Sequence, residues 1–101
     1  MKRSRAHTKY LAGMERQVGE RRAKLTALET RIDSDIAAKR IAGSQQLRLA
    51  LRQAKHHLDV GEARLNELKQ ADDDTFEPCR QLLDDAIEDL SQSIRKAMTR
   101  Y

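Results

Sequence analysis

The chain has 101 residues, of which 36% are charged, 39% are hydrophobic and only 3% are aromatic. Four Gly, one Pro and no Trp leave it without the turn residues and the aromatic or β-branched runs that strands need, so the composition excludes a sheet and predicts one all-α domain. The single cysteine excludes an internal disulfide framework. We expect a cytoplasmic protein without a signal peptide or transmembrane segment, because no long apolar run occurs.

The net charge of +4 is unevenly distributed. Residues 1–31 carry nine Lys/Arg and three Glu, whereas residues 72–101 carry four Lys/Arg and eight Asp/Glu. This asymmetry favours an acidic partner for the N-terminal part, or pairing between the opposite ends of two copies.

The chain begins with a basic arm, residues 1–8, and continues into a predicted long helix over residues 9–70. Apolar residues recur there at steps of three and four, which is typical of a heptad seam, and Arg21 takes one of the seam positions. The apolar members of this N-terminal seam are Leu11, Met14, Val18, Leu25, Leu28, Ile32 and Ile36. A second register, offset from the first, starts at Leu47 and continues to Leu68.

Gly43 and Ser44 are a candidate break inside this helix, because two basic residues precede the Gly and Ser44 could cap a following helix. Against a break, no Pro follows, Leu47 stands where a capping box needs Glu or Gln, and an isolated Gly costs only about 1 kcal/mol in a helix. We therefore predict an unbroken helix over residues 9–70. A break at Gly43-Ser44, which would give a three-helix bundle, is the alternative.

Residues 71–75 form a predicted turn, and a second helix is expected over residues 76–101. Thr75 is the expected N-cap, which puts Pro78 at the third helical position, where its missing N–H costs nothing. Pairing of the two helices as an antiparallel coiled-coil hairpin requires a shared apolar core. The expected members of this hairpin core are Leu47, Leu51, Leu58, Leu65, Leu68, Leu83, Ile87, Leu90 and Ile94.

The two predicted helices differ greatly in length. Around a turn centred on residue 73, paired residues have numbers that sum to about 146, so Tyr101 reaches only to about Gln45. The N-terminal seam then stays uncovered, and burying each of its side chains is worth about 1.5–3 kcal/mol. We predict that a second copy covers it, which makes the seven seam residues the self-association surface of a homodimer; the three-helix alternative covers it within one chain.

Several short segments carry a resemblance that extends over nearly the whole chain. They are Lys9-Tyr10-Leu11, Met14-Glu15, Arg31-Ile32-Asp33, the run from Ala63 to Lys69, Phe76-Glu77, and the ending Met98-Thr99-Arg100-Tyr101. In this layout the chain resembles a group of small bacterial coiled-coil proteins that are loosely assigned to stress response. Relatives usually have Trp in place of Phe76, and this chain also departs in Pro78, Cys79 and its basic N-terminus. The resemblance implies a scaffold or protective protein and brings no catalytic residues.

No catalytic, metal or cofactor site is expected. His56 and His57 are adjacent and so about 100° apart on a helix, and Cys79 has no nearby histidine to act as a base. The leading hypothesis is a non-enzymatic, oligomerising coiled-coil interaction or stress-related protein that acts through the N-terminal seam, with an unidentified protein as a further partner. The alternative is a basic, nucleic-acid-associated protein. Its candidate phosphate contacts are Lys2, Arg3, Arg5 and Lys9.

Overall fold

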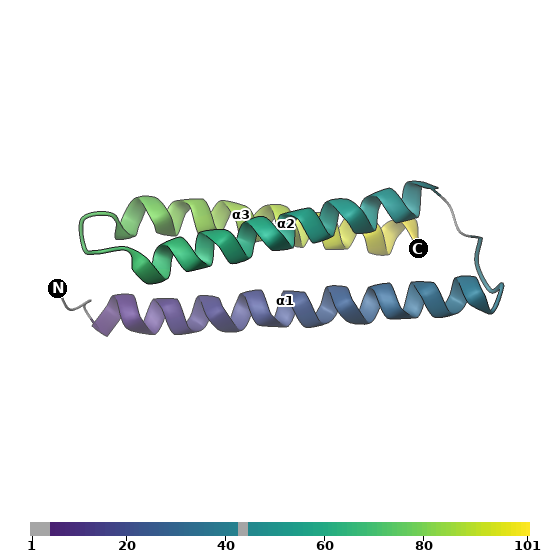
Figure 1. Ribbon diagram of the computed structural model, residues 1–101, viewed down its shortest axis with the longest axis horizontal. Coiled ribbons are helices and arrows are strands. Elements are labelled where there is room, and N and C mark those ends of the chain that lie inside the picture. Colours follow the sequence, from purple (N-terminus) through teal and green to yellow (C-terminus); the bar gives the residue numbers. More distant parts are fainter. Residues whose placement is uncertain (1–4, 43–44) are drawn as a thin grey trace.

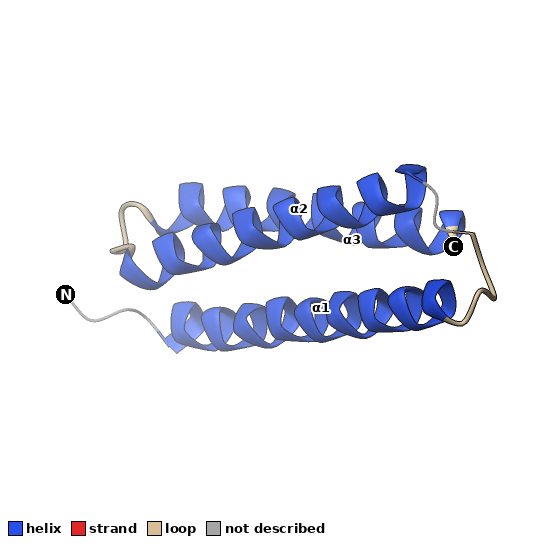
Figure 2. Cartoon of the chain, turned by 45° about the vertical axis from the view of Figure 1, so that its right-hand side comes forward, coloured by secondary structure: helices blue, strands red, loops and turns tan. Residues whose placement is uncertain are grey.

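The computed structural model describes residues 5–42 and 45–101, which form three helices. They are α1 (Arg5–Ala37), α2 (Gln45–Gln70) and α3 (Phe76–Arg100). Successive helices run antiparallel and make an elongated bundle with Cα extents of 56 × 17 × 16 Å (Figures 1 and 2). The all-helical prediction is confirmed. The prediction of one helix over residues 9–70 is wrong, and the three-helix alternative fits the structure.

The break between α1 and α2 begins before the predicted position. The N–H of Arg40 donates to the carbonyl of Asp35 (2.8 Å), the N–H of Lys39 donates to the carbonyl of Ile36 (3.0 Å), and Lys39 has a φ of 59°. These two bonds around a left-handed residue form a Schellman motif, which stops a helix by satisfying its last carbonyl groups. Lys39 therefore takes the position that a Gly normally occupies. Gly43 and Ser44, including the expected cap at Ser44, lie outside the described residues.

The turn between α2 and α3 follows the sequence prediction closely. Helix α3 begins at Phe76 with Thr75 at the N-cap position, and Pro78 is its third residue. The Thr75 hydroxyl does not cap α3, however. Its oxygen accepts the N–H of Asp72 (3.2 Å), while Asp72 Oδ1 accepts the N–H of Thr75 (3.0 Å). This reciprocal pair closes the turn, and the backbone N–H bonds to Asp72 hold the pKa of its carboxyl below the usual value.

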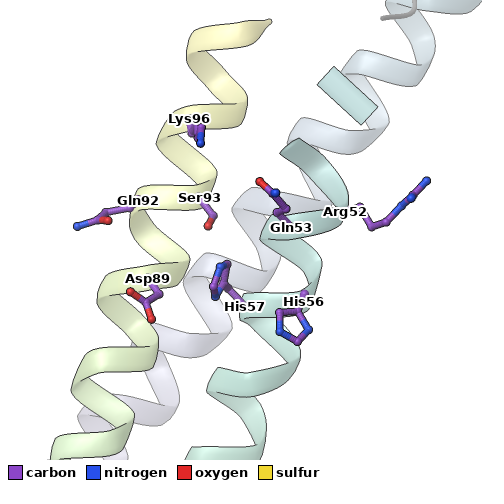
Figure 3. A pocket seen from close by; sticks show the side chains of 8 residues that line it. All are labelled: Arg52, Gln53, His56, His57, Asp89, Gln92, Ser93 and Lys96. Carbon is purple, nitrogen blue, oxygen red and sulfur yellow. The ribbon is translucent and has the colours of Figure 1, made fainter. Parts of the chain in front are cut away.

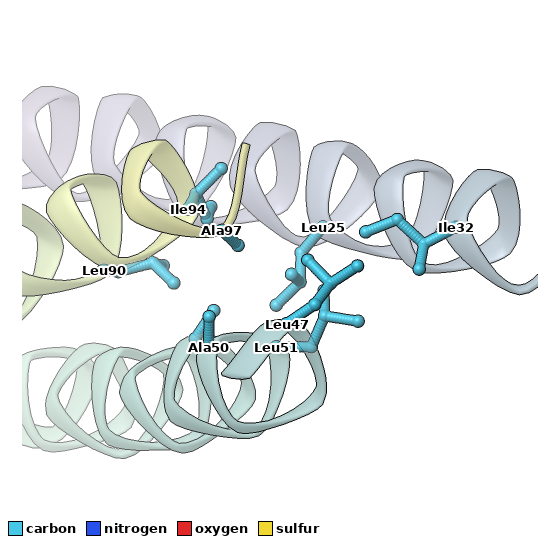
Figure 4. Packing of buried hydrophobic residues seen from close by; sticks show 9 residues of the cluster. Leu25, Ile32, Leu47, Ala50, Leu51, Leu90, Ile94 and Ala97 are labelled. Atoms are coloured by element: carbon cyan, nitrogen blue, oxygen red, sulfur yellow. The ribbon is translucent and has the colours of Figure 1, made fainter. Parts of the chain in front are cut away.

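The core consists of two clusters along the bundle, each built from all three helices. The Phe76 cluster lies at the end where α3 begins, and its buried members are Leu11, Met14, Val18, Leu65, Leu68, Phe76, Leu83 and Ile87. The Ala54 cluster lies at the end where α3 stops (Figure 4), and its buried members are Leu25, Ile32, Leu47, Ala50, Leu51, Ala54, Leu90, Ile94 and Ala97. The expected hairpin-core residues are divided between the two clusters, and Leu58 is partly buried against both.

The expectation that the N-terminal seam is exposed is wrong. Five of its residues are 8% exposed or less, and the other two, Leu28 and Ile36, are partly buried against the Ala54 cluster. The physical reason is the break after Ala37, because it lets α1 fold back and cover α2 and α3 within one chain. The seam that we predicted to bind a second copy is thus part of the core.

Arg21 lies on the buried side of α1, between the two core clusters. Its Nε donates to Ser91 Oγ of α3 at 2.9 Å, and its Nη1 donates to the Gln17 carbonyl at 3.2 Å. These bonds satisfy a charged group in the place of an apolar seam residue. Within residues 5–42 and 45–101, no helix has the length and apolar character needed to cross a membrane.

Candidate functional site

The described part of the basic arm, residues 5–8, lies at an acidic end of the bundle. Lys2 and Arg3 lie outside the described residues, while Arg5 and Lys9 are exposed on the first turns of α1. These turns are fixed beside the acidic start of α3, because the His7 ring stacks on Phe76 with centroids 3.8 Å apart. His7 Nδ1 also lies 3.4 Å from an Asp73 carboxylate oxygen. Arg5 and Lys9, the two expected phosphate contacts that the structure describes, therefore lie at the end of the bundle that holds the acidic turn.

The fold gathers basic residues at the opposite end of the bundle. Residues 45–57 and 91–101 contain six Lys/Arg and no Asp/Glu, whereas residues 72–90 contain eight Asp/Glu and one Arg. Because α2 and α3 are antiparallel, the start of α2 lies beside the end of α3 (Figure 1). The α2–α3 pair consequently has a basic half and an acidic half, and we use these two names below.

A groove follows the outer surface between α2 and α3 in the basic half. Two adjoining hollows, which share Gln53 and Lys96, make it continuous. The residues that line this α2–α3 groove are Gln46, Leu49, Ala50, Arg52, Gln53, His56, His57, Asp89, Gln92, Ser93, Lys96 and Arg100. Asp89 is the one acidic residue among them. The groove can therefore attract anionic groups along most of its length.

Figure 3 shows how the side chains of the larger hollow are arranged. Gln53 and His57 of α2 and Ser93 of α3 lie between the two helices, whereas Arg52 extends away from α3. Asp89, Ser93 and Lys96 follow one another on successive turns of α3. Polar side chains of both helices thus lie between them, and Arg52 points outward.

The cationic groups of the groove are largely unused within the bundle. Among the described residues, Arg52 and Lys96 have neither a hydrogen bond nor an ion pair, and Arg100 contributes one bond, from Nη1 to Gln46 Oε1 at 3.2 Å. Leu49 beside them keeps half of its surface exposed. Charges and apolar surface are both available to a partner here.

The other candidate sites of the sequence are not assembled into a chemical centre. The rings of His56 and His57 are tilted by 60° with centroids 5.6 Å apart. In the part of the chain that the structure describes, no three His, Cys, Asp or Glu side chains come together in a way that could hold a metal ion. Cys79 is half-buried against the Phe76 cluster.

A tyrosine hydroxyl fastens α1 to α3 at each end of the bundle. Tyr10 donates to Asp84 Oδ1 at 2.5 Å; burial above all, and then this bond, raises the pKa of Tyr10 to about 12. Tyr101 donates to Asp35, which holds the pKa of that carboxyl below its usual range and raises the pKa of Tyr101. Neither contact was predicted from the sequence.

The α2–α3 groove itself was also missed, although the sequence contained a signal for it. Arg48 and Arg52 are four residues apart, as are Lys96 and Arg100, so each pair shares a helix face. Around the predicted turn, the sums of residue numbers place Arg52 opposite Lys96 and Arg48 opposite Arg100. Reading net charge over consecutive segments concealed this arrangement, because the four residues come from two distant segments.

No family model, curated protein or solved structure matches this chain. The resemblance to stress-response coiled-coil proteins therefore stays a prediction.

Proposed function

We propose that this protein is a non-enzymatic helical interaction protein that docks an acidic partner on the basic half of its α2–α3 groove. The observation that carries the proposal is the convergence of six Lys/Arg from residues 45–57 and 91–101 on one end of the bundle, without a single Asp/Glu from those segments. Such a surface steers acidic groups by its electric field and binds them more weakly as salt increases.

The working surface in this proposal differs from the one predicted at first. The N-terminal seam is occupied by the chain itself, so an apolar interface built on it is no longer proposed. The basic groove takes its place as the interaction surface. A scaffold or stress-related role, which the resemblance implies, would use the same groove.

Nucleic acid is a second candidate partner, and the spacing of the basic side chains favours it. Lys96 and Arg100 lie one turn apart on α3, and they line the groove together. A helix face of this kind can contact successive phosphates of a backbone. The acidic half of the bundle limits the contact to a short segment, and the low aromatic content offers little stacking for single strands.

The test measures binding of two defined acidic probes, a labelled poly-glutamate peptide and a mixed-sequence DNA duplex, by fluorescence anisotropy at low salt. We expect Lys96→Gln/Arg100→Gln to weaken binding by about tenfold or more and to reduce the salt slope for DNA by roughly 2. The matched control, Arg5→Gln/Lys9→Gln, removes the same charge at the other end and should change the affinity by less than about threefold. Equal losses in both variants would show that net charge, rather than the groove, binds the probes.

A further inference from the structure

We propose that the acidic partner of the α2–α3 groove is the acidic half of a second copy of this chain, so that two molecules associate antiparallel, face to face, across α3. This inference rests on the proposed function and names its partner. The N-terminal seam is not part of this interface, because α1 stays packed against α2 and α3 in each copy.

Four charged residues of α3 support this pairing by their position. Asp85 and Asp89 are one turn apart, Lys96 and Arg100 are one turn apart, and the seven-residue step from Asp89 to Lys96 keeps all four near one helix face. All four are exposed. One stripe on α3 therefore changes from acidic to basic at about Gln92 and Ser93.

This stripe is complementary to the same stripe of a second copy only in the antiparallel orientation. With a two-fold axis between Gln92 and Ser93, Lys96 faces Asp89 of the second copy and Arg100 faces Asp85 of the second copy. The symmetry makes each contact twice, which gives four ion pairs from one arrangement. A parallel alignment would instead place like charges against each other, which costs binding energy.

The bundle leaves the two acids of this stripe unpaired while it engages other acids nearby. Asp72 bonds to Thr75, and Arg80 forms ion pairs with Glu77 and Asp84 at 2.8 and 3.1 Å. By contrast, within the described residues Asp85 and Asp89 take part in no hydrogen bond or ion pair. Both acids of the stripe are thus available to pair with a second copy.

This face also has exposed apolar surface and enough area for an interface. Leu49 is 50% exposed beside the basic half. Leu82, 45% exposed, precedes Asp89 by seven residues and so lies on the acidic side of the same α3 face. An antiparallel partner brings its Leu82 to the end that holds Leu49. The bundle is 56 Å long and 17 Å wide, so one face offers an area comparable to the roughly 800 Å² per partner of a standard interface.

The experiment exchanges charges between the two halves of the stripe. The all-basic variant carries Asp85→Lys and Asp89→Lys, and the all-acidic variant carries Lys96→Glu and Arg100→Glu. In a homodimer of either variant every contact joins like charges, so we expect self-association to fall by at least about 30-fold. An equimolar mixture of the two restores both contacts and should form a heterodimer as tight as the wild-type dimer.

Sedimentation velocity of the wild type, each variant and the mixture, at a few tens of millimolar salt and again at about 0.5 M, measures these states. Helical circular dichroism shows that each variant is folded, and recovery in the mixture shows it independently. A monomeric wild type together with a monomeric mixture would overturn the inference. So would variants that associate as strongly as the wild type, because another face would then be responsible.

The same samples separate this inference from the proposed function. If the wild type stays monomeric but binds the DNA duplex, and the all-acidic variant loses that binding, the groove takes a phosphate polymer; the inference then fails while the proposed function stands. If the wild type neither associates nor binds either acidic probe, both fail.

Discussion

Helix α1 is held at its two ends by contacts of the same kind, set in different surroundings. At each end a tyrosine hydroxyl donates to an aspartate, and an arginine guanidinium lies 5.8 or 5.9 Å from the ring centroid. Tyr10, however, packs edge-on against the aromatic ring of Phe76 at 6.0 Å between centroids, whereas Tyr101 packs against the aliphatic Ala54 cluster. We therefore expect the packing around each polar contact, more than the contact itself, to decide how firmly it holds α1.

The largest change to this comparison should come from removing the aromatic core at the Tyr10 end. Phe76 is 2% exposed and contacts both His7 and Tyr10, so Phe76→Ala should cost about 3–5 kcal/mol through lost burial and a cavity. Urea unfolding followed by circular dichroism measures this. Met98→Ala, at an exposed site on the same helix, is the control and should stay within about 0.5 kcal/mol. Similar losses in both variants would contradict the described core.

Alkaline titration of a Tyr101→Phe variant should isolate the ionisation of Tyr10. Burial raises the pKa of Tyr10 to about 12 from its ordinary value of 10.0, so the folded state binds the Tyr10 proton more tightly than the unfolded state does. The stability that Tyr10 contributes is therefore present below pH 10 and is lost as the pH rises towards 12. In Tyr101→Phe protein, tyrosinate absorbance should titrate near 12 when folded and near 10 in concentrated urea. A midpoint near 10 in the folded protein would show that Tyr10 is solvated.

Removing each hydroxyl at neutral pH should give unequal effects. Tyr10→Phe deletes the 2.5 Å bond to Asp84 and should cost about 1 kcal/mol. Tyr101→Phe should cost less, because burial is the leading cause of the pKa shift of Tyr10 but not of that of Tyr101, so the Tyr101 contact is more solvated. Denaturant midpoints of the two variants measured side by side provide the comparison. A larger loss for Tyr101→Phe would reverse our ranking of the two ends.

The smallest predicted effect concerns the connection that follows the C-terminal end of α1, which lies near Tyr101. Lys39 has a φ of 59°, which is unfavourable for a residue with a Cβ, so Lys39→Gly should stabilise the protein by roughly 0.5–1 kcal/mol. Thermal unfolding would show this as a rise in Tm of a few degrees. Ala38→Gly, one residue earlier, should give no gain. A loss of stability in Lys39→Gly would mean that the Lys39 side chain makes a contribution of its own.

Heptad spacing was sufficient to predict what is buried, but not what covers it. The expected hairpin-core residues lie in the core, and α3 begins at Phe76 as predicted, because apolar periodicity and the Asp-Thr-Pro signals act locally. The end of α1 depends on Lys39 adopting a left-handed conformation that its residue type disfavours. Here the free energy gained by burying the seam against α2 and α3 outweighs the local conformational preference of Lys39. The spacing of apolar residues in the sequence does not report on that competition.

The candidate site was predictable to a smaller extent. Arg5 and Lys9 were identified as basic residues, but only the fold shows that the Asp-rich turn lies beside them. The position of the turn alone would have placed Lys96 opposite the first half of α2. Finding this pair required a comparison of residues across the two helices rather than along the chain.

An odd number of antiparallel helices places the first and last helical residues, Arg5 and Arg100, at opposite ends of a bundle 56 Å long. A pulling force between them acts along the helix axes. It therefore loads the interfaces of α1 and α3 in shear, where the buried side chains of both core clusters resist sliding together, instead of peeling one helix away turn by turn. We therefore expect the bundle to be mechanically stiff when it is pulled between its two ends.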